Sequence, residues 1–494
     1  MINQEKTPIL DAVREWNHKN AAFYTPGHKR GKGISQELRS LFGESVFKAD
    51  LTELEGLDSL HCPEGVIKEA QELAADIFGA SKTWFLVNGS TCGIEAAILA
   101  TCNHGDKIIL PRNVHYSAVS GLILSGAIPI FIHPEYDSVL DIAHSITTDA
   151  VEDALAKHPD AKAVMIVYPT YYGVCGDVKA IAEICHRYNI PLLVDEAHGA
   201  HFIFHPDFPI PSLKANADLV IQSTHKTLGA MTQASMLHLQ GNLIDIDRVG
   251  KALQLLQSTS PSYILLASLD AARQQMALYG KGLMTQTLQL AEDARNRISK
   301  LPLISLLSEG LLSKNLSGSL DKTRLTITVS QLGITGFEVE EILDNQLGVT
   351  PEFASMHNIT FIISLGNTQQ DIDDLVAAIA TLVKIRLSKI HPSTTKPQQK
   401  SSQFLWENFF PIENPLQMSP REAFFATTKS LPLRETTGYI CAEIVCPYPP
   451  GIPVLMPGEI ITEGAIEYLL KIHSMGSFIT ASTDINNATF KVVI

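Results

Sequence analysis

Leu193-Val-Asp-Glu-Ala-His-Gly199 and, further along, Leu219-Val-Ile-Gln-Ser-Thr-His-Lys226 are the two stretches that decide the fold of this 494-residue chain. Each is a short apolar run that ends in polar residues, and Lys226 lies thirty-one residues after Asp195. Short apolar runs of this kind are typical of buried strands in a parallel sheet. A lysine placed directly after such a run is shielded, and burial lowers the pKa of lysine toward the neutral, nucleophilic amine.

The same pattern continues on both sides of these stretches. Strand-like runs occur at residues 84–87, 107–110, 128–132, 163–168, 191–194, 219–222 and 234–239. Helical patterns separate most of them, including one at 63–79 that is expected to carry Pro63 and Glu64 in its first turn. This alternation predicts an α/β fold with a mostly parallel, helix-covered sheet. Because ligands bind outside the carboxyl ends of such strands, Asn88, Asp195 and 223–226 are expected to form one site.

The chain is too long for one ordinary core, so several domains are expected. A polar, proline-bearing stretch at 388–403 is typical of a linker. A second α/β pattern precedes it, with strands at 324–329 and 359–365 and helices at 337–346 and 371–385. The predicted parts are an N-terminal arm (1–35), a large domain (36–300), a small α/β domain (301–387), the linker and a C-terminal domain (404–494).

Composition limits the compartment and the partners. The net charge of −14 disfavours nucleic acid or an anionic membrane as the main partner. The N-terminus lacks a secretory pattern, and no apolar run approaches the ~18 residues of a membrane span. The seven cysteines form no Cys-x-x-Cys pair, which disfavours a zinc ribbon or a thioredoxin-like site. We therefore expect a cytoplasmic protein.

The polar residues after the strands supply an amine, a carboxylate and hydroxyls. Pyridoxal phosphate (PLP) enzymes need a lysine for the Schiff base, an acid for the pyridinium nitrogen and a phosphate site. Lys226 and Asp195 fit the first two roles, and Asn88-Gly-Ser-Thr91 before a helix fits the third. An ordinary helix cap is the alternative for Ser90 and Thr91. His115 either caps a helix or stacks on a planar ring.

The stretch from Asp195 to His205 allows two other interpretations. The tetrapeptide Asp195-Glu-Ala-His198 also ends the magnesium-binding strand of DEAH-type helicases, but Gly27-His-Lys-Arg-Gly-Lys-Gly33 does not match their phosphate loop and no strand precedes it. His198, His201 and His205 suggest a metal site, but the intervening glycine and aromatic residues spoil a ligand face. No metal is expected.

Six motifs together resemble the PLP-dependent ornithine/lysine/arginine decarboxylases. They are Thr25-Pro-Gly-His-Lys-Arg-Gly31, Gly56-Leu-Asp-Ser-Leu-His-Cys-Pro-Glu-Gly65, Asn88-Gly-Ser-Thr91, Asp195-Glu-Ala-His-Gly-Ala-His201, Gln222-Ser-Thr-His-Lys-Thr-Leu-Gly229 and Pro447-Tyr-Pro-Pro-Gly-Ile-Pro453. The resemblance implies an aspartate-aminotransferase-like fold (PLP fold type I), active sites at a homodimer interface, and the short form that lacks an N-terminal response-regulator-like domain.

The resemblance also implies roles for single residues. Lys226 would form the Schiff base, Asp195 would face the pyridinium nitrogen, His115 would stack on the ring and His198 would lie near its hydroxyl. The phosphate contacts would come from the residues Gly89, Ser90, Thr91, Ser223 and His225.

The expected reaction is decarboxylation of a basic amino acid to the amine and carbon dioxide, as in polyamine metabolism. Arginine is slightly favoured from the resemblance to short-form members of the family, with lysine or ornithine possible. Tyr116, Ser355 and Tyr439 depart from the family pattern and leave the substrate open. Glu443, then Glu352, are the candidates for the substrate's distal cation, with His28 as a further substrate contact. The alternatives are another fold type I lyase or aminotransferase, or a catalytically idle PLP-binding protein.

Overall fold

The structure is a computed structural model that describes residues 2–16, 21–312, 318–389, 414–448, 451–474, 478–480 and 489–494. The chain forms two compact units. The first unit comprises 1–101 and 191–284, and the second comprises 102–190 and 285–494. Among the described residues no helix is both long and apolar enough to cross a membrane. The domain boundaries expected from the sequence stay predictions, and residues 390–403 of the expected linker lie outside the described ranges.

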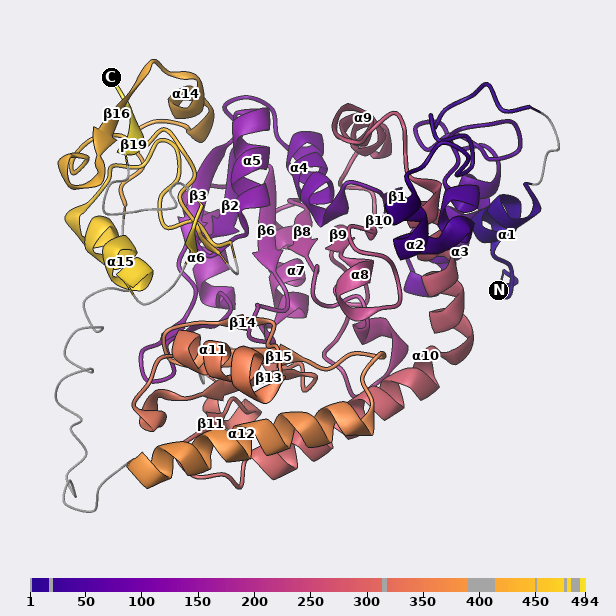
Figure 1. Ribbon diagram of the computed structural model, residues 1–494. Coiled ribbons are helices and arrows are strands. Elements are labelled where there is room, and N and C mark those ends of the chain that lie inside the picture. Colours follow the sequence, from indigo (N-terminus) through magenta and orange to yellow (C-terminus); the bar gives the residue numbers. More distant parts are fainter. Residues whose placement is uncertain are drawn as a thin grey trace. The chain divides into compact units, whose positions relative to one another are not determined.

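The first unit is built on strands in the order β1-β10-β9-β8. Strands β8 and β9 are parallel, whereas β10 runs antiparallel to both β9 and β1. Its helices and strands are α1 (Pro8–Glu15), α2 (Gln36–Ala49), α3 (Val66–Phe78), β1 (Lys82–Leu86), α4 (Gly89–Thr101), β8 (Leu192–Asp195), β9 (Leu219–Gln222), α8 (Thr224–Thr227), β10 (Ser235–Leu239), α9 (Ile246–Leu256) and α10 (Tyr263–Ile298), which continues into the second unit (Figure 1).

Helix α4 packs closely on these strands because Gly93 has no side chain. A Cβ at Gly93 would lie 2.7 Å from the Leu86 Cδ1 atom of β1 and 2.9 Å from the Ile221 Cγ2 atom of β9. Protein cores leave no room for such an added atom without a shift. The Ile221 side of β9 therefore packs directly against α4.

Helix α3 begins later than the sequence predicted. Pro63 and Glu64 were expected in its first turn, but the helix starts at Val66. The reason is a cap from outside the helix, because the Asp58 carboxylate accepts hydrogen bonds from the N–H groups of Glu64, Gly65 and Ile67 at 3.0, 2.8 and 3.0 Å. These bonds satisfy backbone donors at the helix start, so residues 63–65 serve as the cap and not as the first turn.

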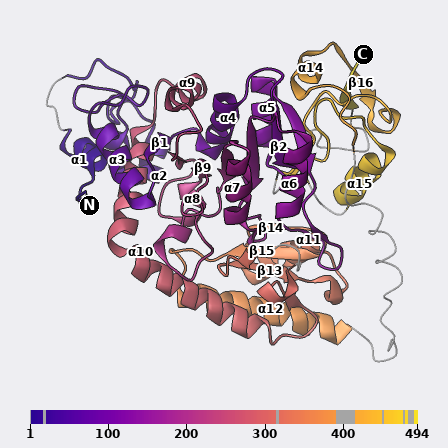
Figure 2. The ribbon, with the colours of Figure 1, turned by 180° about the vertical axis from the view of Figure 1, so that it is seen from behind.

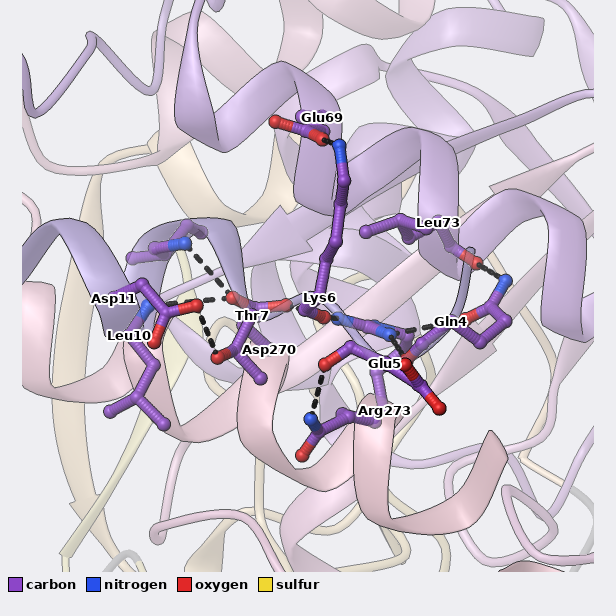
Figure 3. A network of polar contacts seen from close by, with 12 residues as sticks. Gln4, Glu5, Lys6, Thr7, Leu10, Asp11, Glu69, Leu73, Asp270 and Arg273 are labelled. Carbon is purple, nitrogen blue, oxygen red and sulfur yellow. Dashed lines mark hydrogen bonds and ion pairs between the residues drawn. The ribbon is translucent and has the colours of Figure 1, made fainter. Parts of the chain in front are cut away.

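The N-terminal segment is held on α10 by a buried ion pair (Figure 3). Arg273 and Asp270 are both 0% exposed, with Nη2 and Oδ1 2.6 Å apart. Arg273 also donates to the backbone carbonyls of Gln4 and Lys6, at 2.9 and 2.5 Å. Asp270 Oδ2 accepts the Ile9 N–H at 2.9 Å, at the start of α1. Both charges therefore serve to fix the chain before and within α1.

The second unit contains parallel strands in the order β6-β2-β3, with α6 and α7 side by side on one face (Figure 2). It also holds a four-stranded antiparallel sheet in the order β11-β13-β15-β14. The elements up to residue 389 are β2 (Lys107–Pro111), α5 (Tyr116–Ser125), β3 (Ile128–Ile132), β4 (Tyr136–Asp137), β5 (Ile142–Ala143), α6 (Thr148–Lys157), β6 (Ala163–Val167), β7 (Val174–Cys175), α7 (Val178–Arg187), β11 (Ser305–Leu306), β12 (Ser319–Leu320), β13 (Arg324–Thr328), α11 (Gly336–Leu347), β14 (Phe353–Ala354), β15 (Asn358–Ile362) and α12 (Gln369–Lys389).

The four-stranded sheet has its own hydrophobic core. Its side chains come from β13, β15, α11, α12 and the end of α10, and they include Ile298, Leu325, Leu343, Phe361 and Leu382. The sequence predicted this small α/β assembly, and its strands and helices lie within a few residues of the expected ranges.

The C-terminal part of the second unit contacts residues 102–190. Its elements are α14 (Pro420–Phe425), β16 (Thr428–Pro432), β17 (Pro447–Tyr448), α15 (Glu463–Ser474), β18 (Phe478–Ile479) and β19 (Thr489–Val493). Glu459, which is 1% exposed, forms an ion pair with Arg112 at 3.2 Å. Arg112 also donates to the carbonyls of Pro453 and Val454, at 2.7 and 3.0 Å. These bonds attach the C-terminal residues to the end of β2.

Candidate active site

Lys226 lies in α8, the short helix that follows β9 directly. Its amine Nζ is 3.0 Å from Nε2 of His198, which lies three residues after Asp195, the last residue of β8. Lys226 is half-buried and His198 is buried. Because a lysine nitrogen with a hydrogen donates and a neutral imidazole nitrogen accepts, this pair can pass a proton between the two side chains.

Asp195 ends β8 and is 9% exposed. Its Oδ1 accepts the N–H of Ala197 at 3.1 Å. Burial raises the pKa of Asp195, while the positive charge of Lys226 and the Ala197 N–H act in the opposite direction. A buried carboxylate of this kind gains most from a cationic partner. Asp195 is thus suited to hold a protonated ring nitrogen.

The start of α4 carries polar groups that could bind an anion. Gly89 has φ +76°, a left-handed conformation that glycine adopts without strain, and it turns the chain from β1 into the helix. Ser90 Oγ accepts a hydrogen bond from the buried Ser223 Oγ at 2.8 Å, which joins the α4 start to the end of β9. The N–H groups and dipole at a helix start attract phosphate.

Two residues that sequence reasoning missed support this turn. Gln257 Oε1 accepts the Val87 N–H at 2.9 Å, and Gln233 Nε2 donates to the Val87 carbonyl at 2.6 Å. The backbone just before Gly89 is therefore held by side-chain amides from two distant segments. No local pattern in the sequence marks either glutamine, since only the folded contacts bring them to β1.

The remaining predicted residues of the first unit are Thr91, in the first turn of α4, His225 and His28. His225 Nδ1 is 3.0 Å from the Ala234 carbonyl and donates to it, so Nε2 can donate to an anion when the ring is protonated. His28 forms hydrogen bonds within the N-terminal segment, where Nε2 is 3.0 Å from Asp50 Oδ2 and Nδ1 accepts the Gly31 N–H at 3.0 Å. The first unit thus brings together Asp195, His198, Lys226 and the residues at the α4 start, while His28 is held by its own neighbours.

His115, Glu352 and Glu443 belong to the second unit. His115 is the N-cap of α5, and its Nδ1 accepts the Ser117 N–H at 3.3 Å, which realises the capping alternative. Glu352 is exposed. Glu443 is half-buried and its Oε1 accepts the Lys491 N–H at 2.7 Å. Burial raises the pKa of Glu443, and Lys491 opposes that rise.

Comparison with known proteins decides the family. The model for "Orn/Lys/Arg decarboxylase, major domain" matches residues 7–371, and the model for the C-terminal domain of the same family matches residues 405–479. The chain belongs to the Orn/Lys/Arg decarboxylase family. It is therefore a PLP-dependent amino-acid decarboxylase, as the six motifs predicted.

Relatives of similar length support this assignment. An arginine decarboxylase of Bacillus subtilis is 42% identical over 95% of this chain and 94% of its own length. An arginine decarboxylase of Halalkalibacterium halodurans is 40% identical over 100% of this chain and 99% of its own. Lysine decarboxylase A from Pseudomonas aeruginosa has a similar fold, with a TM-score of 0.84 at 22% identity over 99% of this chain and 80% of that one. The predicted α/β fold of the PLP fold type I class is confirmed.

The side chains of the first unit fit the cofactor of this family. PLP carries an aldehyde, a ring nitrogen and a phosphate, and the site offers an amine on Lys226, a buried carboxylate on Asp195 and hydroxyls at a helix start. Among the described residues no cluster of three His, Cys, Asp or Glu side chains is suited to hold a metal ion.

Proposed function

We propose that this Orn/Lys/Arg decarboxylase acts on arginine and releases carbon dioxide and the corresponding amine. The proposal is supported by the two relatives named arginine decarboxylase, which are 42% and 40% identical over nearly the whole chain. The observation that carries the chemistry is the contact between Lys226 Nζ and His198 Nε2 at 3.0 Å, beside the buried Asp195.

The residues that would hold the cofactor are those predicted from the sequence. Lys226 would bind the aldehyde carbon, Asp195 would keep the ring nitrogen protonated, and His198 would lie near the ring hydroxyl. The phosphate would be held by the residues Gly89, Ser90, Thr91, Ser223 and His225. When bound, PLP supplies the electron sink for the pair left on Cα as carbon dioxide departs.

Proton transfer falls to the protein. Decarboxylation of an amino acid consumes one proton, because the bond from Cα to the carboxylate is replaced by a bond from Cα to hydrogen. Lys226 and His198 share a hydrogen bond, so one of them donates this proton and the other replenishes it. His115, the N-cap of α5, is proposed to stack on the ring.

The far end of arginine is a planar guanidinium that favours a carboxylate partner. We propose Glu443 for this role, with Glu352 as the other candidate and His28 as a further substrate contact. Glu443 is half-buried, and burial disfavours its charged form. A guanidinium beside it would form an ion pair and so stabilise the charged carboxylate.

The test is a panel of arginine, lysine and ornithine with trapping of labelled carbon dioxide and identification of the amine. We expect the highest kcat/KM for arginine. Faster release from lysine or ornithine would refute the substrate proposal while leaving the decarboxylase family untouched. Glu443→Gln should raise the KM for arginine with little change in kcat, and Glu352→Gln, which tests the other candidate, should leave the KM unchanged. An unchanged KM in Glu443→Gln would refute its role.

We also propose a cytoplasmic homodimer that works in polyamine metabolism. All seven cysteines are free thiols, which suits a reducing compartment. Sedimentation equilibrium of the purified protein tests the assembly, and a single species at the monomer mass would refute the dimer.

A further inference from the structure

Five polar side chains of the first unit are buried together although none belongs to the cofactor site. They form what we call the Glu196 network. Its members are Thr83 of β1, His238 of β10, Gln222 of β9, Glu196 after β8, and Ser212. None is more than 2% exposed. Buried polar groups are costly unless each has a partner, so a set of five in one place calls for a reason.

The network runs without a break from β1 across β10 and β9 to the residue after β8. Thr83 Oγ1 is 2.8 Å from His238 Nδ1, and His238 Nε2 is 3.2 Å from Gln222 Oε1. Gln222 Nε2 donates to Glu196 Oε2 at 2.6 Å. The other carboxylate oxygen of Glu196 accepts from the N–H and the hydroxyl of Ser212, at 2.8 and 2.6 Å. Every side-chain nitrogen and oxygen of the five residues therefore has a partner.

The ionised carboxylate of Glu196 sets the direction of every bond. Since it only accepts, the Gln222 amide nitrogen must face it, so Gln222 Oε1 accepts from His238 Nε2–H and His238 Nδ1 accepts from the Thr83 hydroxyl. Burial lowers the pKa of His238 to about 3, which keeps the ring neutral with one donor and one acceptor. Burial raises the pKa of Glu196 to about 7, with Ser212 and Gln222 opposing that rise.

The network lies on the opposite side of the strands from α4. Ile221 faces α4 at Gly93, and successive side chains of a strand point to opposite faces, so Gln222 points away from α4. Asp195 pairs with Ile221 in the parallel register, and the Glu196 N–H donates to the Ile221 carbonyl at 2.9 Å. Glu196 directly follows Asp195 in the chain, and Gln222 directly precedes Ser223. The side chains of Glu196 and Gln222 are hydrogen-bonded to each other on the face of the strands opposite α4.

We propose that Glu196 is a positioning residue, which fixes the carboxyl ends of β8 and β9 so that Asp195 and Ser223 are held in place for PLP. This inference rests on the roles proposed above for those two residues. The close packing around Glu196 fits such a role, because a Cβ at Gly199 would lie 2.7 Å from Glu196 Cγ. Residues held by buried networks keep their geometry better than residues held by packing alone.

The test compares three variants at pH 8, where Glu196 is mostly ionised. Glu196→Met removes the acceptor and leaves the Ser212 and Gln222 donors without it. Glu196→Gln keeps an acceptor for Ser212, and the rest of the network is satisfied if Gln222 and His238 reverse their donor and acceptor atoms. Asp218→Leu is the matched control, since Asp218 is a buried carboxylate that binds the Leu192 N–H at the amino ends of the same strands.

The main measurement is the dissociation constant of PLP, from titration of each apoprotein followed by the absorption of the bound cofactor. We expect an increase of about tenfold or more for Glu196→Met, and values within about threefold of wild type for Glu196→Gln and Asp218→Leu. The unfolding temperatures of the apoproteins show whether Glu196→Met and Asp218→Leu are comparably destabilised.

Unchanged PLP affinity in Glu196→Met would overturn the proposal, and so would an equal loss of affinity in Asp218→Leu. If Glu196→Met does not fold, Ser212→Ala removes one donor to Glu196, and we expect a two- to fivefold weaker affinity; no change would count against the proposal. The cofactor roles are checked separately, because wild type must show an absorption band that Lys226→Ala lacks. Absence of that band in wild type would refute the proposed site itself.

Discussion

The ion pair between Arg273 and Asp270 should control how firmly the N-terminal segment is held on α10. Arg273→Met removes the charge that faces the fully buried Asp270 carboxylate, together with the donors to Gln4 and Lys6. Removing one partner of a buried pair costs about 3–5 kcal/mol. Asp270 keeps the Ile9 N–H, so the lower end of that range applies, about 3 kcal/mol.

Amide hydrogen exchange of residues 4–13, followed by mass spectrometry on the holoprotein, measures this loss. A cost of about 3 kcal/mol corresponds to exchange on the order of a hundredfold faster where opening is local. The variant that also carries Asp270→Asn removes both charges and keeps an oxygen for Ile9, so we expect it to exchange about tenfold more slowly than Arg273→Met alone. Arg14→Met breaks an exposed pair with Asp11 and should change little.

Exchange within threefold of wild type in Arg273→Met would refute the reasoning. A double variant that exchanges as fast as the single one would do the same, because it would show that the uncompensated charge of Asp270 is not the main cost.

Three further predictions concern the interior and the site. Burial raises the pKa of Glu95 in α4 to about 7, so the stability of the folded protein falls as the pH rises from the ordinary carboxyl value toward 7. Glu95→Gln should therefore be more stable than wild type by about 1 kcal/mol at pH 8 and by less at pH 5. Urea unfolding midpoints at the two pH values measure this difference. Gly199→Ala should lower the unfolding temperature, because its Cβ would lie 2.7 Å from Glu196 Cγ, whereas Gly282→Ala in α10 meets nothing within 4 Å and should stabilise by about 0.5–1 kcal/mol. Asp195→Asn keeps the shape but not the charge, and kcat for carbon dioxide release should fall by about a hundredfold or more, while an unchanged kcat would remove Asp195 from the site.

The strands were predictable because local pattern and tertiary burial agree there. The run at 219–222 coincides with β9, and the polar residues directly after it supply Ser223 and Lys226. Likewise, Asp195 ends β8 as its position after an apolar run indicated. In each case one short stretch contains both the apolar run that forms the strand and the polar side chain that follows it in the site.

What the sequence could not predict depends on contacts between distant segments. Asp58 caps α3 from outside the helix, so the start of that helix was placed too early. Gln257 supports Val87 across 170 residues of chain. Glu196 was visible in its motif, but the place of His238 in the Glu196 network becomes apparent only from the pairing of β1 with β10, where Thr83 lies opposite His238.

The pairing of β1 with β10 has a consequence for synthesis of the chain. β1 ends at Leu86 and β10 begins at Ser235, and within the first unit β1 has β10 as its neighbour. At ribosomal rates of about 5–20 residues per second, β1 and its buried Trp84 and Phe85 leave the ribosome some 7–30 s before their partner does. Through that interval the nascent protein exposes an apolar strand with an open edge, so the yield of folded enzyme should depend on chaperones that bind such segments early in translation.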